Sequence, residues 1–144
     1  MKRQAFSLIS LLSLLLVAGS AIAQTVHVSA NIPFNFGVGS KTFPAGTYDV
    51  RPIDHHDNKI LLLKARDGHA SMMVLSNVAE NLKPADKTKL VFNQYRNQYF
   101  LSEIWVNGAT RGTRLVKSSR EKELARDMAQ DLTRGRVEIV ASLQ

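Results

Sequence analysis

The chain has 144 residues, of which 44% are hydrophobic and 22% are charged, and its formal net charge at pH 7 is +7. It contains no cysteine, which excludes disulfides, thiolate zinc sites and thiol nucleophiles. Because a basic protein favours negatively charged partners, the charge directs the search for function toward anionic surfaces and polymers.

The first 23 residues have the three regions of a secretory signal peptide. Lys2 and Arg3 are positively charged, 6–18 form an apolar stretch, and Ala21-Ile22-Ala23 supplies the small residues of a cleavage site. The apolar stretch has about 13 residues, whereas a transmembrane helix needs roughly 20. We therefore predict a cleavable signal peptide over residues 1–23, a periplasmic or secreted protein, and no membrane span after cleavage.

Residues 24–144 form the mature chain, which is long enough for a single stable β-rich domain. Loss of Lys2 and Arg3 leaves 17 of the 19 Lys and Arg residues against 12 Asp and Glu, so the formal charge falls from +7 to +5. Outside the cytoplasm, the anionic partners for such a surface are lipopolysaccharide, phospholipid headgroups and acidic polysaccharide. Nucleic acid is not an expected partner.

Residues 25–115 consist of short β-branched and aromatic runs separated by turn residues, which is typical of an antiparallel meander. In the first run, 25–36, Pro33 predicts an edge strand or a break. The run 60–63 is apolar at every position, which predicts a central strand covered on both faces. The polar segment 77–87 is expected to be a connection. Further strands are expected at 48–53, 71–76, 89–95, 99–106 and 113–117.

Glycine and its neighbours mark the turns between these runs. Asp67-Gly68 and Asn107-Gly108 are typical of tight turns, because glycine adopts a positive φ without steric cost. Pro44-Ala45-Gly46 predicts a turn in which Gly46 takes a positive φ. Arg96-Asn97-Gln98 is expected to form the tip of a hairpin.

The pattern changes at Ser118, where a capping box predicts the start of a helix over 119–132. Ser118 is expected to accept from the third backbone amide, while Glu121 reaches back to the cap. Apolar residues recur at helical spacing on one face, at Leu124, Met128 and Leu132. Gly135 is expected to stop the helix, and the alternation over 137–143 predicts a last strand.

These elements place the chain in the mainly β class, with about eight strands and one helix before the last strand. An antiparallel β-sandwich and an up-and-down barrel both fit this order of elements. We favour closure or near-closure of the sheet, because closure removes exposed strand edges.

Several segments of the mature chain carry a family resemblance: 32–36 (Ile-Pro-Phe-Asn-Phe), Val38-Gly39, Lys41, 43–48 (Phe-Pro-Ala-Gly-Thr-Tyr), 99–106 and Ser119-Arg120-Glu121. With these residues the chain resembles a group of small exported β-rich proteins of unknown function from acidobacterial-type soil bacteria. The resemblance spans most of the mature chain. It implies an exported β domain, and its best motif, a turn between strands, implies no active site.

The cluster Asp54, His55, His56 and Asp57 is the candidate metal site. Imidazole and carboxylate ligands suit zinc, copper or nickel. Adjacent residues of a strand point to opposite faces, so these side chains converge only if the chain bends sharply. A polar hairpin tip is the alternative interpretation.

The densest basic stretch contains the candidate polyanion-binding residues Arg111, Arg114, Lys117 and Arg120. In a strand, Arg111 and Lys117 share one face and Arg114 takes the other, so a single flat patch does not follow from spacing alone. A solvated charged surface is the alternative.

Four aromatic residues are candidates for lining a ligand cavity, as in a lipocalin-like barrel: Tyr95, Tyr99, Phe100 and Trp105. Ordinary core packing is the alternative. No serine has the setting of an activated nucleophile, and we expect neither an enzyme nor a cofactor.

The sequence therefore favours an exported, non-enzymatic β domain that acts as a structural or interaction module of the cell envelope. Its partner would be an anionic envelope component or another envelope protein. Two alternatives remain open: a small hydrophobic ligand carrier with a barrel cavity, and a metal-binding protein that uses His55 and His56.

Overall fold

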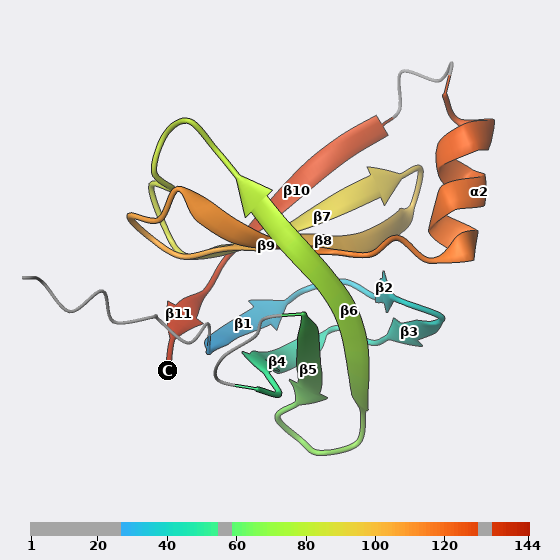
Figure 1. The fold of residues 1–144 in the computed structure, drawn as a ribbon. Helices are drawn as coiled ribbons and strands as arrows, with labels where there is room; N and C mark the ends of the chain where they lie inside the picture. The colour runs from blue at the N-terminus through green and yellow to red at the C-terminus, as the bar shows by residue number, and fades with distance from the viewer. Residues whose placement is uncertain (1–26, 55–58, 130–133) are drawn as a thin grey trace, which may run out of the picture.

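The computed structural model describes residues 27–54, 59–129 and 134–144 (Figure 1). The predicted signal peptide lies outside these residues. The elements are β1 Val28–Ile32, β2 Phe36–Val38, β3 Lys41–Phe43, β4 Gly46–Pro52, β5 Ile60–Ala65, β6 Ser71–Glu80, β7 Lys89–Tyr95, β8 Gln98–Trp105, β9 Arg111–Leu115, α2 Ser119–Asp127, β10 Arg134–Val140 and β11 Ser142–Leu143. The mainly β class, with a helix ahead of the C-terminal strand segment, is confirmed. The described residues form eleven strands instead of about eight, and β2 pairs in parallel with β8, so the sheet is mixed and not purely antiparallel. The distinction between sandwich and barrel stays a prediction.

The strands follow the order β10-β7-β8-β9-β6-β5-β4-β1-β11. Off this path, β2 pairs with β8, and β3 pairs with β2. The strand β6 connects two halves of this sheet, as Figure 1 shows by its long diagonal course. Residues 71–75 of β6 pair with β5, and residues 76–80 pair with β9. We call the part containing β11, β1, β4, β5 and 71–75 the β4–β5 half, and the part containing 76–80, β9, β8, β7 and β10 the β7–β8 half.

The extension of β6 to Glu80 shows that the predicted connection over 77–87 began too early. Asn77 and Glu80 are exposed, whereas Ala79 is buried with only 1% of its surface exposed. The polar residues face solvent on a strand that β9 holds through backbone pairing from Ser76 to Glu80. Composition alone does not reveal this pairing, because β9 lies some 30 residues along the chain.

The C-terminal segment supplies the strands at both ends of the order. The strand β10 runs antiparallel to β7, and β11 runs antiparallel to β1. Between them the backbone N–H of Ala141 donates to the carbonyl of Thr88 at 2.9 Å. The predicted strand over 137–143 is therefore confirmed, and the structure divides it between two partners.

The main core lies between the inner faces of the two halves. Alternate positions of the central strands contribute Tyr48, Leu61, Leu63, Leu90, Phe92 and Ile104 to it. The strand β5 contributes Leu61 and Leu63, both with 0% exposure, while Ile60 is 42% exposed. The prediction that 60–63 is covered on both faces is therefore wrong, because its outer face lies open.

The turn that carries the family resemblance is built differently from the expectation. Gly46 begins β4 and pairs with Ile32, and the positive φ of the described glycines occurs at Gly39, Gly68 and Gly108. Side chains hold this turn instead: the hydroxyl of Tyr48 donates to the carbonyl of Pro44 at 2.7 Å, and Asn35 Oδ1 accepts from the amide of Ala45 at 3.0 Å. The break at Pro33 and the turns at Gly68 and Gly108 are confirmed.

Helix α2 packs its apolar side against the outer face of the β7–β8 half. Met128, 1% exposed, packs with Tyr95 and Phe100, and Leu124 lies beside them. The cap at Ser118 is confirmed, because its Oγ accepts from the amide of Glu121 at 3.1 Å. The helix ends at Asp127 and is too short and too polar to cross a membrane.

Three details of the helix prediction are wrong. The helix ends at Asp127, whereas the predicted range ran to 132. Gly135 does not stop the helix, because it lies within β10 and pairs with Gln94. The Glu121 carboxylate, rather than closing a capping box, accepts from Asn93 Nδ2 of β7 at 2.8 Å. Because α2 packs against the sheet, the Glu121 side chain lies within hydrogen-bond distance of Asn93. Leu132 lies outside the described residues.

Candidate functional site

A bulge in β8 places Glu103 on the outer face of the β7–β8 half. Val91 pairs with Glu103 and Phe92 pairs with Leu101, so Ser102 has no partner on β7. The extra residue reverses the alternation along β8. Phe100 under the helix and Glu103 therefore face the same side, although simple alternation would separate them.

Glu103 is a nearly buried carboxylate held by three donors. Its Oε1 accepts from Nε of Arg114 at 3.0 Å. Its Oε2 accepts from Nη2 of Arg136 at 2.7 Å and from Nε1 of Trp105 at 3.0 Å. These donors come from β9, β10 and β8, so the cluster ties three strands together on one face.

The electrostatics of Glu103 favour its charged form. Burial acts to raise its pKa, but hydrogen bonds from Trp105 and Arg114 and the charge of Arg136 together lower the pKa below its ordinary value. Charge-assisted bonds of this kind are about twice as strong as neutral ones. The carboxylate therefore stays ionised and fixes both guanidinium groups at neutral pH.

The two arginines remain accessible. The Glu103 side chain is 8% exposed, whereas those of Arg114 and Arg136 are 56% and 59% exposed. One buried negative charge is thus shared by two exposed positive charges, which leaves an excess of one positive charge. Guanidinium groups present several N–H donors suited to carboxylate and phosphate. We call Arg114 and Arg136 the arginine pair, and Glu103 is the carboxylate that they share.

A second buried carboxylate lies at the helix side of this face. Glu121 is 4% exposed, and its Oε1 accepts from Asn93 Nδ2 at 2.8 Å and from the Tyr95 hydroxyl at 3.4 Å. Lys117 Nζ donates to the same hydroxyl at 3.4 Å. Asn93 pairs with Arg136 across β7 and β10. Polar side chains therefore run from the arginine pair toward α2.

The structure separates the four predicted polyanion-binding residues. Arg114 belongs to the arginine pair, and Lys117 is turned toward Tyr95. Arg111 donates from Nε to Glu80 at 3.1 Å, so its charge is balanced one to one. Arg120 Nη2 donates to Gln98 Oε1 at 2.6 Å, away from the pair.

Sequence reasoning missed Arg136, which lies 22 positions beyond Arg114. A signal for it exists in the alternation of β10, where Val137 and Ile139 pack on the core and Arg136 and Glu138 are exposed. That pattern indicates an outward-facing arginine. It does not indicate which carboxylate the arginine meets.

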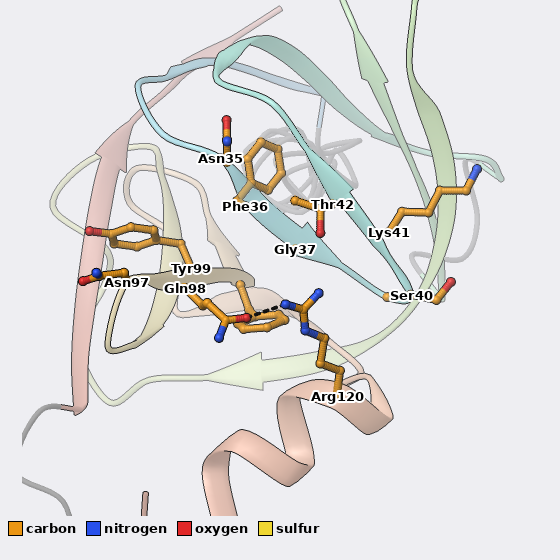
Figure 2. A pocket seen from close by; sticks show the side chains of 12 residues that line it. Asn35, Phe36, Gly37, Ser40, Lys41, Thr42, Asn97, Gln98, Tyr99 and Arg120 are labelled. Atoms are coloured by element: carbon orange, nitrogen blue, oxygen red, sulfur yellow. Dashed lines mark hydrogen bonds between the residues drawn. The ribbon is translucent and has the colours of Figure 1, made fainter.

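A shallow hollow of about 120 Å³ lies between the β2–β3 hairpin and the β7–β8 turn (Figure 2). Figure 2 shows Arg120 reaching from α2 toward Gln98 on its rim. Its other exposed polar lining residues are Asn35, Ser40, Lys41, Thr42 and Asn97. Pockets for drug-sized ligands usually have roughly 300–1,000 Å³ and a mostly apolar lining. This hollow is smaller and more polar than the site of a hydrophobic ligand carrier.

Two of the four candidate aromatic residues, Tyr99 and Phe100, line this hollow, whereas Tyr95 and Trp105 do not. Tyr95 and Phe100 pack against Met128 of α2, and Trp105 packs with Ala79, Ala85 and Val91. Tyr99 stacks on Phe34 with ring centroids 4.1 Å apart. The structure uses these side chains in three separate packing clusters.

The candidate metal site falls mostly outside the described residues. Asp54 is described and exposed, whereas His55, His56 and Asp57 are not described. Within the described ranges, no group of three or more His, Asp or Glu side chains could hold a metal ion. The metal interpretation stays a prediction.

Comparison of the chain with protein family models, with curated proteins and with solved structures finds no match.

Proposed function

We propose that the protein is an exported, non-enzymatic binding domain of the cell envelope that holds an anionic envelope component against the outer face of the β7–β8 half. The observation that supports this proposal best is the sharing of the Glu103 carboxylate between Arg114 and Arg136. The carboxylate orients both guanidinium groups before a ligand arrives. Pre-ordered side chains lower the entropic cost of binding.

The charge balance around this site also supports an anionic ligand. Arg111 and Glu80 form an exposed one-to-one pair that contributes no excess charge. The arginine pair keeps one positive charge in excess, and the exposed Lys117 lies on the helix side. The exposed charges on this face are therefore mainly positive, which favours an anionic ligand over a cationic one.

The test is retention of the protein on immobilised dextran sulfate over a salt gradient. Arg114→Gln/Arg136→Gln should elute at clearly lower salt than the wild type, because both oriented cations are removed. Arg111→Gln is the matched control on β9, and it should elute close to the wild type.

A variant without the arginine pair leaves Glu103 buried without its cations, which costs stability. The triple variant Glu103→Gln/Arg114→Gln/Arg136→Gln removes all three charges together and avoids this problem. Circular dichroism checks that each variant is folded. If the folded triple variant is retained as strongly as the wild type, the arginine pair is not the binding site and the proposal is wrong.

A further inference from the structure

The outer face of the β4–β5 half carries a strip of exposed apolar side chains. In one row across neighbouring strands, Ile53 bonds through its amide to the carbonyl of Ile60, Ile60 pairs with Leu75, and the amide of Val116 bonds to the carbonyl of Leu75. In the next row, Leu62 pairs with Met73. We call these residues the apolar strip: Ile53, Ile60, Leu62, Met73, Leu75 and Val116.

The strip is exposed in the folded domain. Met73 and Leu75 are 65% and 59% exposed, and Ile53, Ile60 and Val116 are each more than 40% exposed. The inner faces of the same strands already bury Leu61, Leu63 and Val74 in the main core. Contiguous apolar side chains that the core does not use mark an interaction surface.

The strip adjoins the arginine pair. Alternation along β9 buries Thr113 and Leu115 and exposes Arg114 and Val116, so Arg114 and Val116 share the outer face about 7 Å apart along the strand. The register thus places one end of the apolar strip beside the site proposed above for an anionic component.

Positive charge also borders the other side of the strip. Arg51 pairs with Leu62, and Lys64 pairs with Asp49 and Ser71 in the following row. Asp49 is in an ion pair with Arg66 at 3.3 Å. Within the described ranges neither Arg51 nor Lys64 is in an ion pair. The apolar strip therefore lies between cations on both sides.

We propose that this face docks on an anionic lipid surface, with the apolar strip inserted at the headgroup boundary and the arginine pair on lipid phosphates. The inference rests on the proposed function and names its partner. A bilayer with acidic lipids offers an anionic layer above an apolar one, which is the order of chemistry that the strip and its cations require. A second copy of the chain fits less well, because its own cations would face those of the first.

The test is co-sedimentation of the processed protein, its N-terminus determined by mass spectrometry, with phosphatidylcholine vesicles with and without phosphatidylglycerol. Binding should require phosphatidylglycerol and should weaken with salt, because the cations are exposed. Met73→Ser/Leu75→Ser should weaken vesicle binding about tenfold, because it removes apolar contact area. Val78→Ser is the control, since Val78 lies on β6, is 66% exposed and faces the opposite side.

The same variants on dextran sulfate separate this inference from the proposed function. Met73→Ser/Leu75→Ser should be retained on dextran sulfate like the wild type, because a soluble polyanion binds only the cations. Wild-type protein that binds dextran sulfate but not the anionic vesicles would overturn the lipid inference and leave the proposed function standing. Unchanged vesicle binding by Met73→Ser/Leu75→Ser would also overturn it. A third contrary result would be a wild-type protein that does not bind vesicles but forms a dimer, which Met73→Ser/Leu75→Ser converts to a monomer. If the folded triple variant loses both retention on dextran sulfate and binding to the anionic vesicles, both proposals are supported.

Discussion

Trp105 packs directly over Gly112 of the neighbouring strand. A Cβ atom at position 112 would lie 2.7 Å from Cδ2 and Cε3 of the indole and 2.8 Å from the carbonyl oxygen of Ile104. Both distances are shorter than van der Waals contact allows. The absence of a side chain at Gly112 thus lets Trp105 pack against the backbone of β9 while its Nε1 donates to Glu103 Oε2 at 3.0 Å.

Gly112→Ala should therefore destabilise the protein, because the backbone carbonyl of Ile104 cannot move aside as a flexible side chain would. Forced overpacking usually costs about 1–3 kcal/mol. Urea unfolding followed by tryptophan fluorescence measures the change. Gly46→Ala is the control, because a Cβ there would meet Tyr48 Cε2 at an ordinary 3.5 Å. Equal stabilities for the two variants would contradict the packing argument.

Glu103→Gln should change how the free energy of unfolding depends on pH below 7. The folded state lowers the pKa of Glu103, so its contribution is present above the unfolded value of about 4.3. That contribution is lost as the pH falls through the folded pKa. Unfolding free energies measured from pH 7 downward should fall less steeply for the variant than for the wild type.

The matched control for this acid titration is Glu80→Gln, whose carboxylate is 66% exposed and bonded to Arg111. An exposed pair contributes about 0–1 kcal/mol, so the control should follow the wild-type profile. If Glu103→Gln follows the wild type as well, the three donors do not stabilise the ionised carboxylate.

Tyr48→Phe should weaken the turn at Pro44 and alter the response to alkali. The lost hydrogen bond to the Pro44 carbonyl is worth about 0.5–1.5 kcal/mol at neutral pH. Burial, together with the charge of Asp67, raises the pKa of Tyr48. The wild type therefore loses this contribution as the pH rises above the unfolded value of about 10, and the variant should lack that loss.

Urea unfolding at pH 7 and above pH 10 measures both effects of the Tyr48 substitution. Tyr99→Phe is the control, because Tyr99 is half-buried and its hydroxyl meets Gln94 at 3.4 Å. It should keep the alkaline loss of the wild type. The interpretation is wrong if Tyr48→Phe loses as much stability in alkali as Tyr99→Phe.

Ser118→Ala should loosen α2 on the sheet. Loss of an N-cap serine costs about 0.5–2 kcal/mol, and here the cap also positions Glu121 beside Asn93. Ser119→Ala is the control, since Ser119 is an exposed residue of the first turn. Hydrogen exchange of the helix amides should rise for the first variant and stay near the wild type for the second.

Local chemistry explains which features were predictable from the sequence. Glycine at positions 68 and 108 permits a positive φ, Pro33 cannot donate to a ladder, and Ser118 caps a helix through contacts within one turn. Each depends on a few neighbouring residues. At Tyr48 the hydrogen-bond partner Pro44 and the ring of Phe43 are local, whereas Phe36, which Tyr48 also packs against, belongs to another strand.

The sequence by itself determined the mainly β class, most strand positions, the helix with its cap and apolar side, and Arg114 as a candidate. Only the tertiary structure decided that β6 crosses to β9, that a bulge at Ser102 turns Glu103 outward, and that Arg136 shares this carboxylate with Arg114. The physical reason is range. Periodicity and capping act over a few residues, whereas pairing and charge sharing depend on strands that meet only after the chain has folded.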